Sequence, residues 1–244
     1  MFPIRLFVSF GNVTMEQFTF FVNFKTYPQA TGEEAVALAK ICFKMGRQTG
    51  QTIIPVVQAA DLFRIKKETD GLLWTQHVDY FEAGAHTGWL SPEAILAAGA
   101  SGTLLGHSEH QLPPGTVKQV LARVKSSKSC LPAGRCKVQS FETMVAAKTL
   151  GQLEKLAKLK PDYLAYEIAE LIAGKVSIAQ ANPKAIAKAV KIAGETPLIV
   201  GAGVNKAEDL AVACNLGAKG VLVANAIMST KDPKVALLEL LRLV

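Results

Sequence analysis

The sequence predicts a single closed barrel of eight parallel β-strands ringed by helices, an α/β fold of the (β/α)8 type. Short apolar runs alternate eight times with longer amphipathic stretches over residues 18–244. This alternation is typical of parallel strands joined by helical crossovers, and unbroken apolar strands indicate burial on both faces of the sheet. Eight such units in 244 residues match the usual size of a barrel. An open doubly wound sheet is the structural alternative, but no Gly-x-Gly-x-x-Gly follows the first strand.

The strands are predicted from apolar runs that polar residues, glycine or proline bound on each side. In chain order they are Phe18–Phe24, Thr52–Val57, Leu73–Val78, Gly102–Gly106, Thr143–Ala146, Asp162–Glu167, Pro197–Val200 and Gly220–Ala224.

The helices are predicted from apolar residues that recur at helical spacing between the strands. They cover Gly32–Thr49, Ala59–Glu68, a short helix from Ser91, Thr116–Lys125, Leu150–Leu159, Pro183–Ile192, Lys206–Asn215 and Pro233–Leu243. Two of them begin with a capping pattern. Thr31 precedes an acidic first turn, and Ser91 precedes a proline at the first helical position.

Composition excludes several classes of protein. Half of the residues are hydrophobic and 19% are charged, so the chain is too apolar to be disordered. No run approaches the roughly 18 uncharged apolar residues of a membrane span, so no membrane partner is expected. The net charge of +7 is spread thinly, which indicates a solvated basic face and not a nucleic-acid site, and it would also suit a small anionic ligand. The four cysteines show neither disulfide-scaffold nor zinc spacing, so we expect a cytoplasmic protein with packed thiols at Cys42 and Cys214. Residues 1–17 are expected to form a loosely packed extension to one catalytic domain, 18–244.

Reactive and small residues lie at the ends of five of the expected strands. They are Asn23 and Lys25 at the end of the first strand, His107 at the fourth, Glu167 at the sixth, Gly201-Ala-Gly203 at the seventh and Ala224-Asn225 at the eighth. Each has an ordinary structural explanation by itself, but a parallel barrel brings all five strand ends to one rim.

These residue types together describe one chemistry. A carboxylate can remove a proton beside a carbonyl, an imidazole can polarise that carbonyl, and an ammonium group can stabilise the resulting enediolate. Turns of small residues let backbone N–H groups approach a phosphate closely. The set therefore predicts an aldose–ketose isomerase that acts on a small phosphorylated sugar.

Eight short segments follow one another along the chain as a recognisable set of motifs. They are Val22-Asn-Phe-Lys-Thr-Tyr27, Gln76-His-Val-Asp79, Ala85-His-Thr-Gly88, Leu104-Leu-Gly-His-Ser-Glu109, Pro161-Asp-Tyr-Leu-Ala-Tyr-Glu167, Glu170-Leu-Ile172, Gly201-Ala-Gly203 and Gly220-Val-Leu-Val-Ala224. In this order they resemble the triosephosphate isomerase family, in particular its archaeal branch. The resemblance spans residues 18–244 and implies reversible conversion of dihydroxyacetone phosphate into D-glyceraldehyde 3-phosphate, without a metal or an organic cofactor, in glycolysis and gluconeogenesis.

The resemblance also implies roles for individual residues. Glu167 matches the base, His107 the neutral electrophile and Lys25 the electrostatic residue. The substrate-binding positions match Asn23, Phe24, Lys25, Ile172, Gly203, Ala224 and Asn225. Ile172 falls in the segment that resembles a mobile lid. Thr87 matches the tip of a loop that enters the neighbouring subunit, which implies a homo-oligomer, with a tetramer favoured over a dimer.

Three departures from the family pattern keep alternatives open. Ile168-Ala169 replaces prolines after the base, Asn225 stands where the family has a serine, and residues 130–140 form an insertion. The first two substitutions motivate a rival hypothesis, a non-catalytic phosphosugar-binding paralogue with the same barrel. A sugar-phosphate epimerase is a third reading, but the metal-ligating His and acidic residues that its site requires are not found at these strand ends.

Overall fold

The computed structural model describes residues 18–127, 141–168, 181–204 and 206–242. In this part of the chain, eight parallel strands pair in sequence order, and β1 pairs with β8 to close the barrel. The strands are β1 (Thr19–Asn23), β2 (Thr52–Val57), β3 (Trp74–Thr75), β4 (Gly102–Leu105), β5 (Glu142–Ala147), β6 (Tyr163–Tyr166), β7 (Leu198–Val200) and β8 (Gly220–Val223). The predicted fold class is confirmed.

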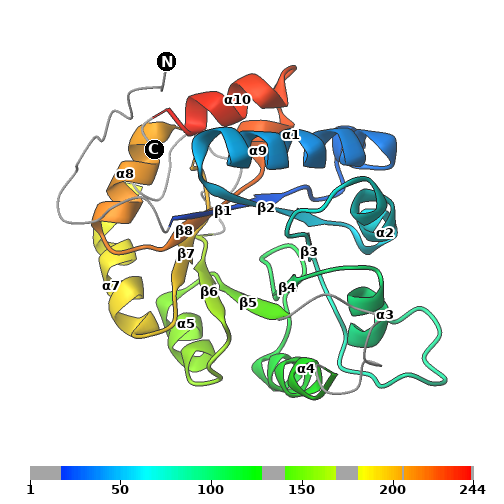
Figure 1. Ribbon diagram of the computed structural model, residues 1–244. Coiled ribbons are helices and arrows are strands. Elements are labelled where there is room, and N and C mark those ends of the chain that lie inside the picture. Colours follow the sequence, from blue (N-terminus) through cyan, green and yellow to red (C-terminus); the bar gives the residue numbers. More distant parts are fainter. Residues whose placement is uncertain (1–17, 128–140, 169–180, 205, 243–244) are drawn as a thin grey trace.

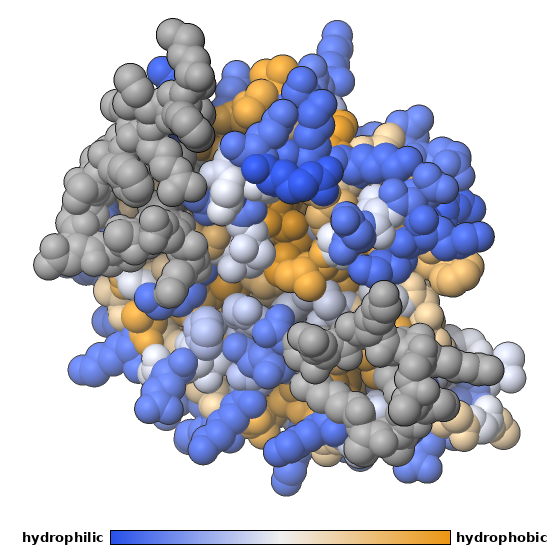
Figure 2. Space-filling view, viewed as in Figure 1, coloured by the Kyte–Doolittle hydropathy of each residue, from blue (hydrophilic) through white to orange (hydrophobic). Residues whose placement is uncertain are grey.

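Helices surround the strands on all sides (Figure 1). They are α1 (Glu33–Thr49), α2 (Ala59–Glu68), α3 (Pro92–Ala97), α4 (Pro114–Ser127), α5 (Leu150–Ala157), α7 (Pro183–Ala193), α8 (Ala207–Asn215), α9 (Asn225–Met228) and α10 (Pro233–Leu240), with a 3-10 turn, η2 (Pro28–Ala30), after β1. The helix α10 packs against α1, so the last helix meets the first. Hydrophilic side chains cover much of this outer ring (Figure 2).

Alternation along each strand produces two apolar cores. One fills the barrel interior and consists of Phe21, Ile54, Val56, Trp74, Leu104, Met144, Ala146, Ala165, Ile199 and Leu222. The neighbouring strand residues point outward and pack against the helices in a second, larger core. Because successive side chains of a strand point to opposite faces, strands buried on both faces are apolar throughout, as the sequence indicated.

Glycine is required where the barrel closes between β1 and β8. Gly220 pairs with Thr19, and a Cβ at Gly220 would overlap the Thr19 carbonyl oxygen. A side chain there would push the two strands apart and open the seam.

The structure corrects some of the predicted boundaries. The α1 helix begins after Gly32, not after a capping Thr31, and the Asp61 carboxylate accepts the Gly32 N–H at 3.1 Å. The predicted third strand, Leu73–Val78, shortens to Trp74–Thr75, and just before it the Leu73 N–H donates to the Ser101 hydroxyl at 3.2 Å. The α9 helix was not predicted, since four residues are too few to show helical periodicity. The Ser91 cap is confirmed by its bond from the Ala94 N–H.

Other sequence expectations have mixed outcomes. Cys42 and Cys214 are buried free thiols, as predicted. Residues 1–17, the 130–140 insertion and Ile172 lie outside the described residues. Within the described ranges, no helix has the length and apolar character needed to cross a membrane.

Candidate active site

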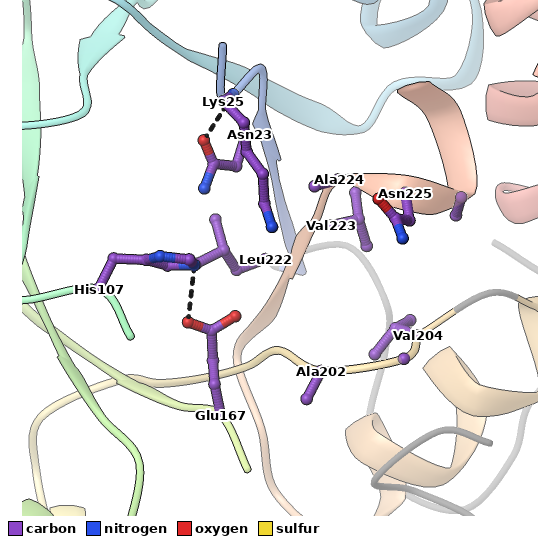
Figure 3. Close-up of a pocket in the computed structure, with 12 residues that line it drawn as sticks. Asn23, Lys25, His107, Glu167, Ala202, Val204, Leu222, Val223, Ala224 and Asn225 are labelled. Atoms are coloured by element: carbon purple, nitrogen blue, oxygen red, sulfur yellow. Dashed lines mark hydrogen bonds and ion pairs between the residues drawn. The ribbon is translucent and has the colours of Figure 1, made fainter. Parts of the chain in front are cut away.

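A pocket lies at the carboxyl ends of the strands, where the sequence places the reactive residues. Its lining is drawn from the ends of β1, β4, β6, β7 and β8 and comprises Asn23, Lys25, His107, Glu167, Ala202, Gly203, Val204, Leu222, Val223, Ala224, Asn225 and Ala226. Figure 3 shows the polar groups of His107, Glu167 and Lys25 gathered at one end, with Asn225 and Val204 at the other. The pocket therefore has a reactive end and a small-residue end.

The Lys25 ammonium is held over the pocket by a strained backbone. Lys25 has a φ of 49°, a conformation that side-chain-bearing residues rarely adopt. Its N–H donates to Asn23 Oδ1 at 3.0 Å, and the Gln76 amide donates to its carbonyl at 2.9 Å. The ammonium itself lies 2.6 Å from a carboxylate oxygen of Glu109. Gln76 and Asn23 thus fix the turn that aims this cation.

The surroundings of His107 identify it as a neutral hydrogen-bond donor. Its Nδ1 accepts the Glu109 N–H at 3.2 Å, so the ring proton resides on Nε2, which faces Glu167. Burial lowers the pKa of His107, and the Lys25 ammonium lowers it further, against an opposing effect of the Glu109 carboxylate. A neutral imidazole with an Nε2–H at the pocket can donate to a substrate oxygen.

The Glu167 carboxyl is buried and has spare hydrogen-bonding capacity. Its Oε2 lies 3.2 Å from His107 Nε2 (Figure 3), but no donor among the described residues is aligned to form a hydrogen bond with it. Burial raises the pKa of Glu167 to about 7; the Lys25 ammonium opposes this shift and the Glu109 carboxylate adds to it. A carboxylate with a pKa near neutrality is well matched to accept and return a proton.

Gly201 provides the space that the Glu167 carboxyl occupies. A Cβ at Gly201 would lie 2.7 Å from Glu167 Cδ and closer still to Oε1. Any side chain at this position would displace the carboxyl group from its place beside His107. The first glycine of the Gly-Ala-Gly segment therefore acts on the reactive end of the pocket.

The opposite end is built from two loops of small residues. Ala202 and Gly203 both have a φ of 69°, so two successive residues after β7 adopt the left-handed conformation. Three non-glycine residues have positive φ in the described part of the chain, and two of them, Lys25 and Ala202, line the pocket. Ala224 and Asn225, at the start of α9 directly after β8, face this loop (Figure 3). The small side chains leave the backbone accessible to a ligand.

A comparison with models of known protein families finds a match over nearly the whole chain. The family model described as triosephosphate isomerase matches residues 18–243.

The chain belongs to the triosephosphate isomerase family.

Its relatives include triosephosphate isomerases of methanogenic archaea. The chain is 35% identical over 227 residues to that of Methanosarcina mazei, covering 91% of this chain and 97% of the relative. It is 35% identical over 223 residues to that of Methanobacterium bryantii, with 90% and 93% covered. The protein of Methanocaldococcus jannaschii is 33% identical over 227 residues, with 91% and 98% covered. The archaeal-type resemblance seen in the motifs is confirmed.

Most of the site residues expected for a triosephosphate isomerase meet in the pocket. Those that line it are Asn23, Lys25, His107, Glu167, Gly203, Ala224 and Asn225. Phe24 does not, because its side chain is fully buried in the outer core. Thr87 is exposed on the third loop, and Ile172 lies outside the described residues.

Sequence reasoning missed several contributors to the site. Leu222 lines the pocket, and the two-residue period of β8 could have revealed it because Leu222 shares a face with Gly220 and Ala224. Gln76 was quoted only as part of a motif, and its contact with Lys25 depends on the spatial proximity of two strand ends. No group of three His, Cys, Asp or Glu residues in the described ranges is arranged to hold a metal ion.

Proposed function

We propose that this chain is a triosephosphate isomerase that interconverts dihydroxyacetone phosphate and D-glyceraldehyde 3-phosphate through an enediolate. One observation carries the proposal. A buried Glu167 carboxyl with a pKa of about 7 lies 3.2 Å from the Nε2 of a neutral His107, and the Lys25 ammonium lines the same pocket. Base, electrophile and cation are the three groups that proton transfer next to a carbonyl requires.

The reaction proceeds by moving one proton between adjacent carbons. The Glu167 carboxylate takes a proton from the hydroxyl-bearing carbon, and the electron pair of that C–H bond forms the C=C of the enediolate. The His107 Nε2–H donates to the carbonyl oxygen, where negative charge develops, and exchanges protons between the two oxygens. Glu167 then returns its proton to the neighbouring carbon, which gives the isomer. The positive charge of Lys25 stabilises the anionic intermediate.

The small-residue end of the pocket holds the phosphate. Ala224 and Asn225 lie across the pocket from Glu167 (Figure 3), and Gly203 lines the same pocket, so the substrate spans from the reactive groups to these loops. Asn23 supports the Lys25 turn, and Phe24 supports it from the core. Ile172, by its place in the sequence, belongs to the lid over the bound substrate. No step uses a metal or an organic cofactor, so EDTA is expected to leave the activity unchanged.

We further propose that the domain 18–244 self-associates through its third loop, as a homotetramer in the cytoplasm. Between Asp79 and Leu90 the loop carries Phe81 against Trp89, with ring centroids 4.6 Å apart and Trp89 54% exposed. An exposed aromatic cluster favours contact with another protein surface. Light scattering on the purified protein tests this: a tetramer supports the proposal, a dimer corrects the number of subunits, and a monomer overturns it.

An isomerase assay coupled to an auxiliary dehydrogenase tests the function. Wild-type protein is expected to convert D-glyceraldehyde 3-phosphate. In Glu167→Gln, kcat is expected to fall about 10²- to 10⁴-fold, since only a carboxylate can accept the proton. Glu154→Gln, on the exposed face of α5, is the matched control and retains the wild-type rate. An inactive wild type that is folded would overturn the proposal and favour the phosphosugar-binding alternative.

A further inference from the structure

A hydrogen bond joins the loop after β1 to the residue that begins α9. The Tyr27 hydroxyl donates to Asn225 Oδ1 at 2.6 Å, across 198 residues of sequence. Both side chains are partly buried, and Asn225 lines the pocket at its small-residue end. In Figure 3 the Asn225 amide nitrogen is turned to the side of Val204, across the pocket from Glu167. The oxygen end of the amide is therefore bound to Tyr27, and the nitrogen end, which has no hydrogen-bond acceptor among the described residues, can meet a ligand.

We propose that Tyr27 is a positioning residue that fixes the Asn225 carboxamide so that its NH2 group donates to the phosphate of the substrate. The inference rests on the proposed function, because it concerns how that pocket recognises its phosphate. It assigns to this chain a side-chain phosphate donor in place of the serine that the family pattern places at this position.

The reason that a second residue is needed lies in the amide itself. A carboxamide presents an acceptor at one end and donors at the other, and the two ends are nearly equal in size. If the oxygen faced a phosphate dianion, the contact would be repulsive. With its oxygen held by the Tyr27 hydroxyl, Asn225 turns its NH2 group to the anion before the anion arrives. Pre-organisation of this kind lowers the cost of binding.

Hydrogen bonds also fix the backbone at Tyr27 and the turn that follows it. Its carbonyl accepts the Thr31 hydroxyl at 2.9 Å and the Ala30 N–H at 2.9 Å. The Gln29 side-chain amide donates to the carbonyl of Met228 at the end of α9, which makes a second link between the two segments. The η2 turn is thus fastened to α9 at both ends of this short helix, so the hydroxyl has a defined position relative to Asn225.

The same loop carries the Lys25 ammonium two residues earlier. Lys25 acts at the reactive end of the pocket and Tyr27 acts through Asn225 at the phosphate end. A change at the Tyr27 hydroxyl should therefore alter affinity for the phosphate without altering proton transfer. A contact made equally in the ground state and the transition state changes KM and leaves kcat unchanged.

Calorimetric binding of inorganic phosphate, together with isomerase kinetics, tests the inference. Tyr27→Phe is expected to raise the dissociation constant of inorganic phosphate and the KM by the same factor, about three- to tenfold, with kcat unchanged. The control Tyr163→Phe removes a hydroxyl at the opposite end of the barrel, at the start of β6, and leaves both constants unchanged. Asn225→Asp keeps an acceptor for Tyr27 but places a carboxylate oxygen against the phosphate, and should weaken phosphate binding more than Tyr27→Phe does.

A double-mutant cycle decides whether Tyr27 acts through Asn225. In an Asn225→Ser background, Tyr27→Phe is expected to have no further effect, because the amide that the hydroxyl orients is gone. An equal effect in both backgrounds, unchanged phosphate binding in Tyr27→Phe, or a loss confined to kcat would each overturn the inference. Each of these three outcomes can occur while the wild type is active. An inactive wild type would instead overturn the proposed function. Phosphate binding is measured without turnover, so the two failures are distinguishable.

Discussion

Replacing Glu167 by glutamine is expected to stabilise the fold progressively as the pH rises. Burial raises the pKa of Glu167 from 4.5 to about 7, so the folded protein holds a proton that the unfolded chain releases. Stability of the wild type therefore falls as the pH rises from about 4.5 to about 7, and the full loss persists above this window. Glutamine does not titrate, so the free energy of unfolding of Glu167→Gln does not fall in this way.

The size of the effect follows from the shift. Each pKa unit corresponds to about 1.36 kcal/mol, so a rise from 4.5 to about 7 costs the ionised wild type about 3 kcal/mol of unfolding free energy. Between about pH 5 and about pH 8, the difference between Glu167→Gln and wild type should grow by about 2 to 3 kcal/mol. The cost of burying the amide itself does not depend on pH, so it cancels from this change.

Urea unfolding at the two pH values, at one protein concentration, measures the difference. Glu154→Gln, whose side chain is 64% exposed in the wild type, is the control and should show no such growth. A difference between Glu167→Gln and wild type that stays constant with pH would refute the reasoning, because it would mean that the buried carboxyl imposes no ionisation cost. The expected result also links stability to function, since the same carboxylate is the proposed base.

Two further changes probe the same carboxyl group. Gly201→Ala is expected to lower kcat about 10²-fold, because the new methyl group would overlap the Glu167 carboxyl and displace it from His107. Steady-state kinetics measure the change, and an unchanged kcat would contradict the tight contact between Gly201 and Glu167. Glu109→Gln removes a negative charge that raises the pKa of Glu167, so the acid limb of the profile of kcat/KM against pH should move to lower pH, and a limb that stays in place or moves upward would exclude this electrostatic effect.

The barrel was predictable because its evidence is local. A strand buried on both faces must be apolar along its whole length, and an outer helix must be apolar on one side, so both periods appear in the sequence. Boundaries were less predictable where a distant residue decides them. The Asp61 carboxylate accepts the N–H of Gly32, and the Ser101 hydroxyl accepts the N–H of Leu73, one residue before β3 begins.

The candidate site was predictable at the level of its residues. Lys25, His107 and Glu167 each follow an apolar strand, and a parallel barrel brings such positions to one rim. The family resemblance implied a neutral His107, but the physical causes of this state and the raised pKa of Glu167 could not be derived from the sequence. The neutral form of His107 depends on an N–H from Glu109 and on burial, and the pKa of Glu167 depends on being enclosed beside Gly201.

The sequence by itself determined the fold class, the family and the set of reactive groups, because each is written in local composition, spacing or motif. Only the tertiary structure decided which groups touch. The Tyr27 hydroxyl meets Asn225 although 198 residues separate them, and Gln76 meets the carbonyl of Lys25 across two strand ends. Such contacts arise at the rim where the strand ends meet, and burial there sets protonation and orientation. These are properties of a packed environment that no single stretch of chain contains.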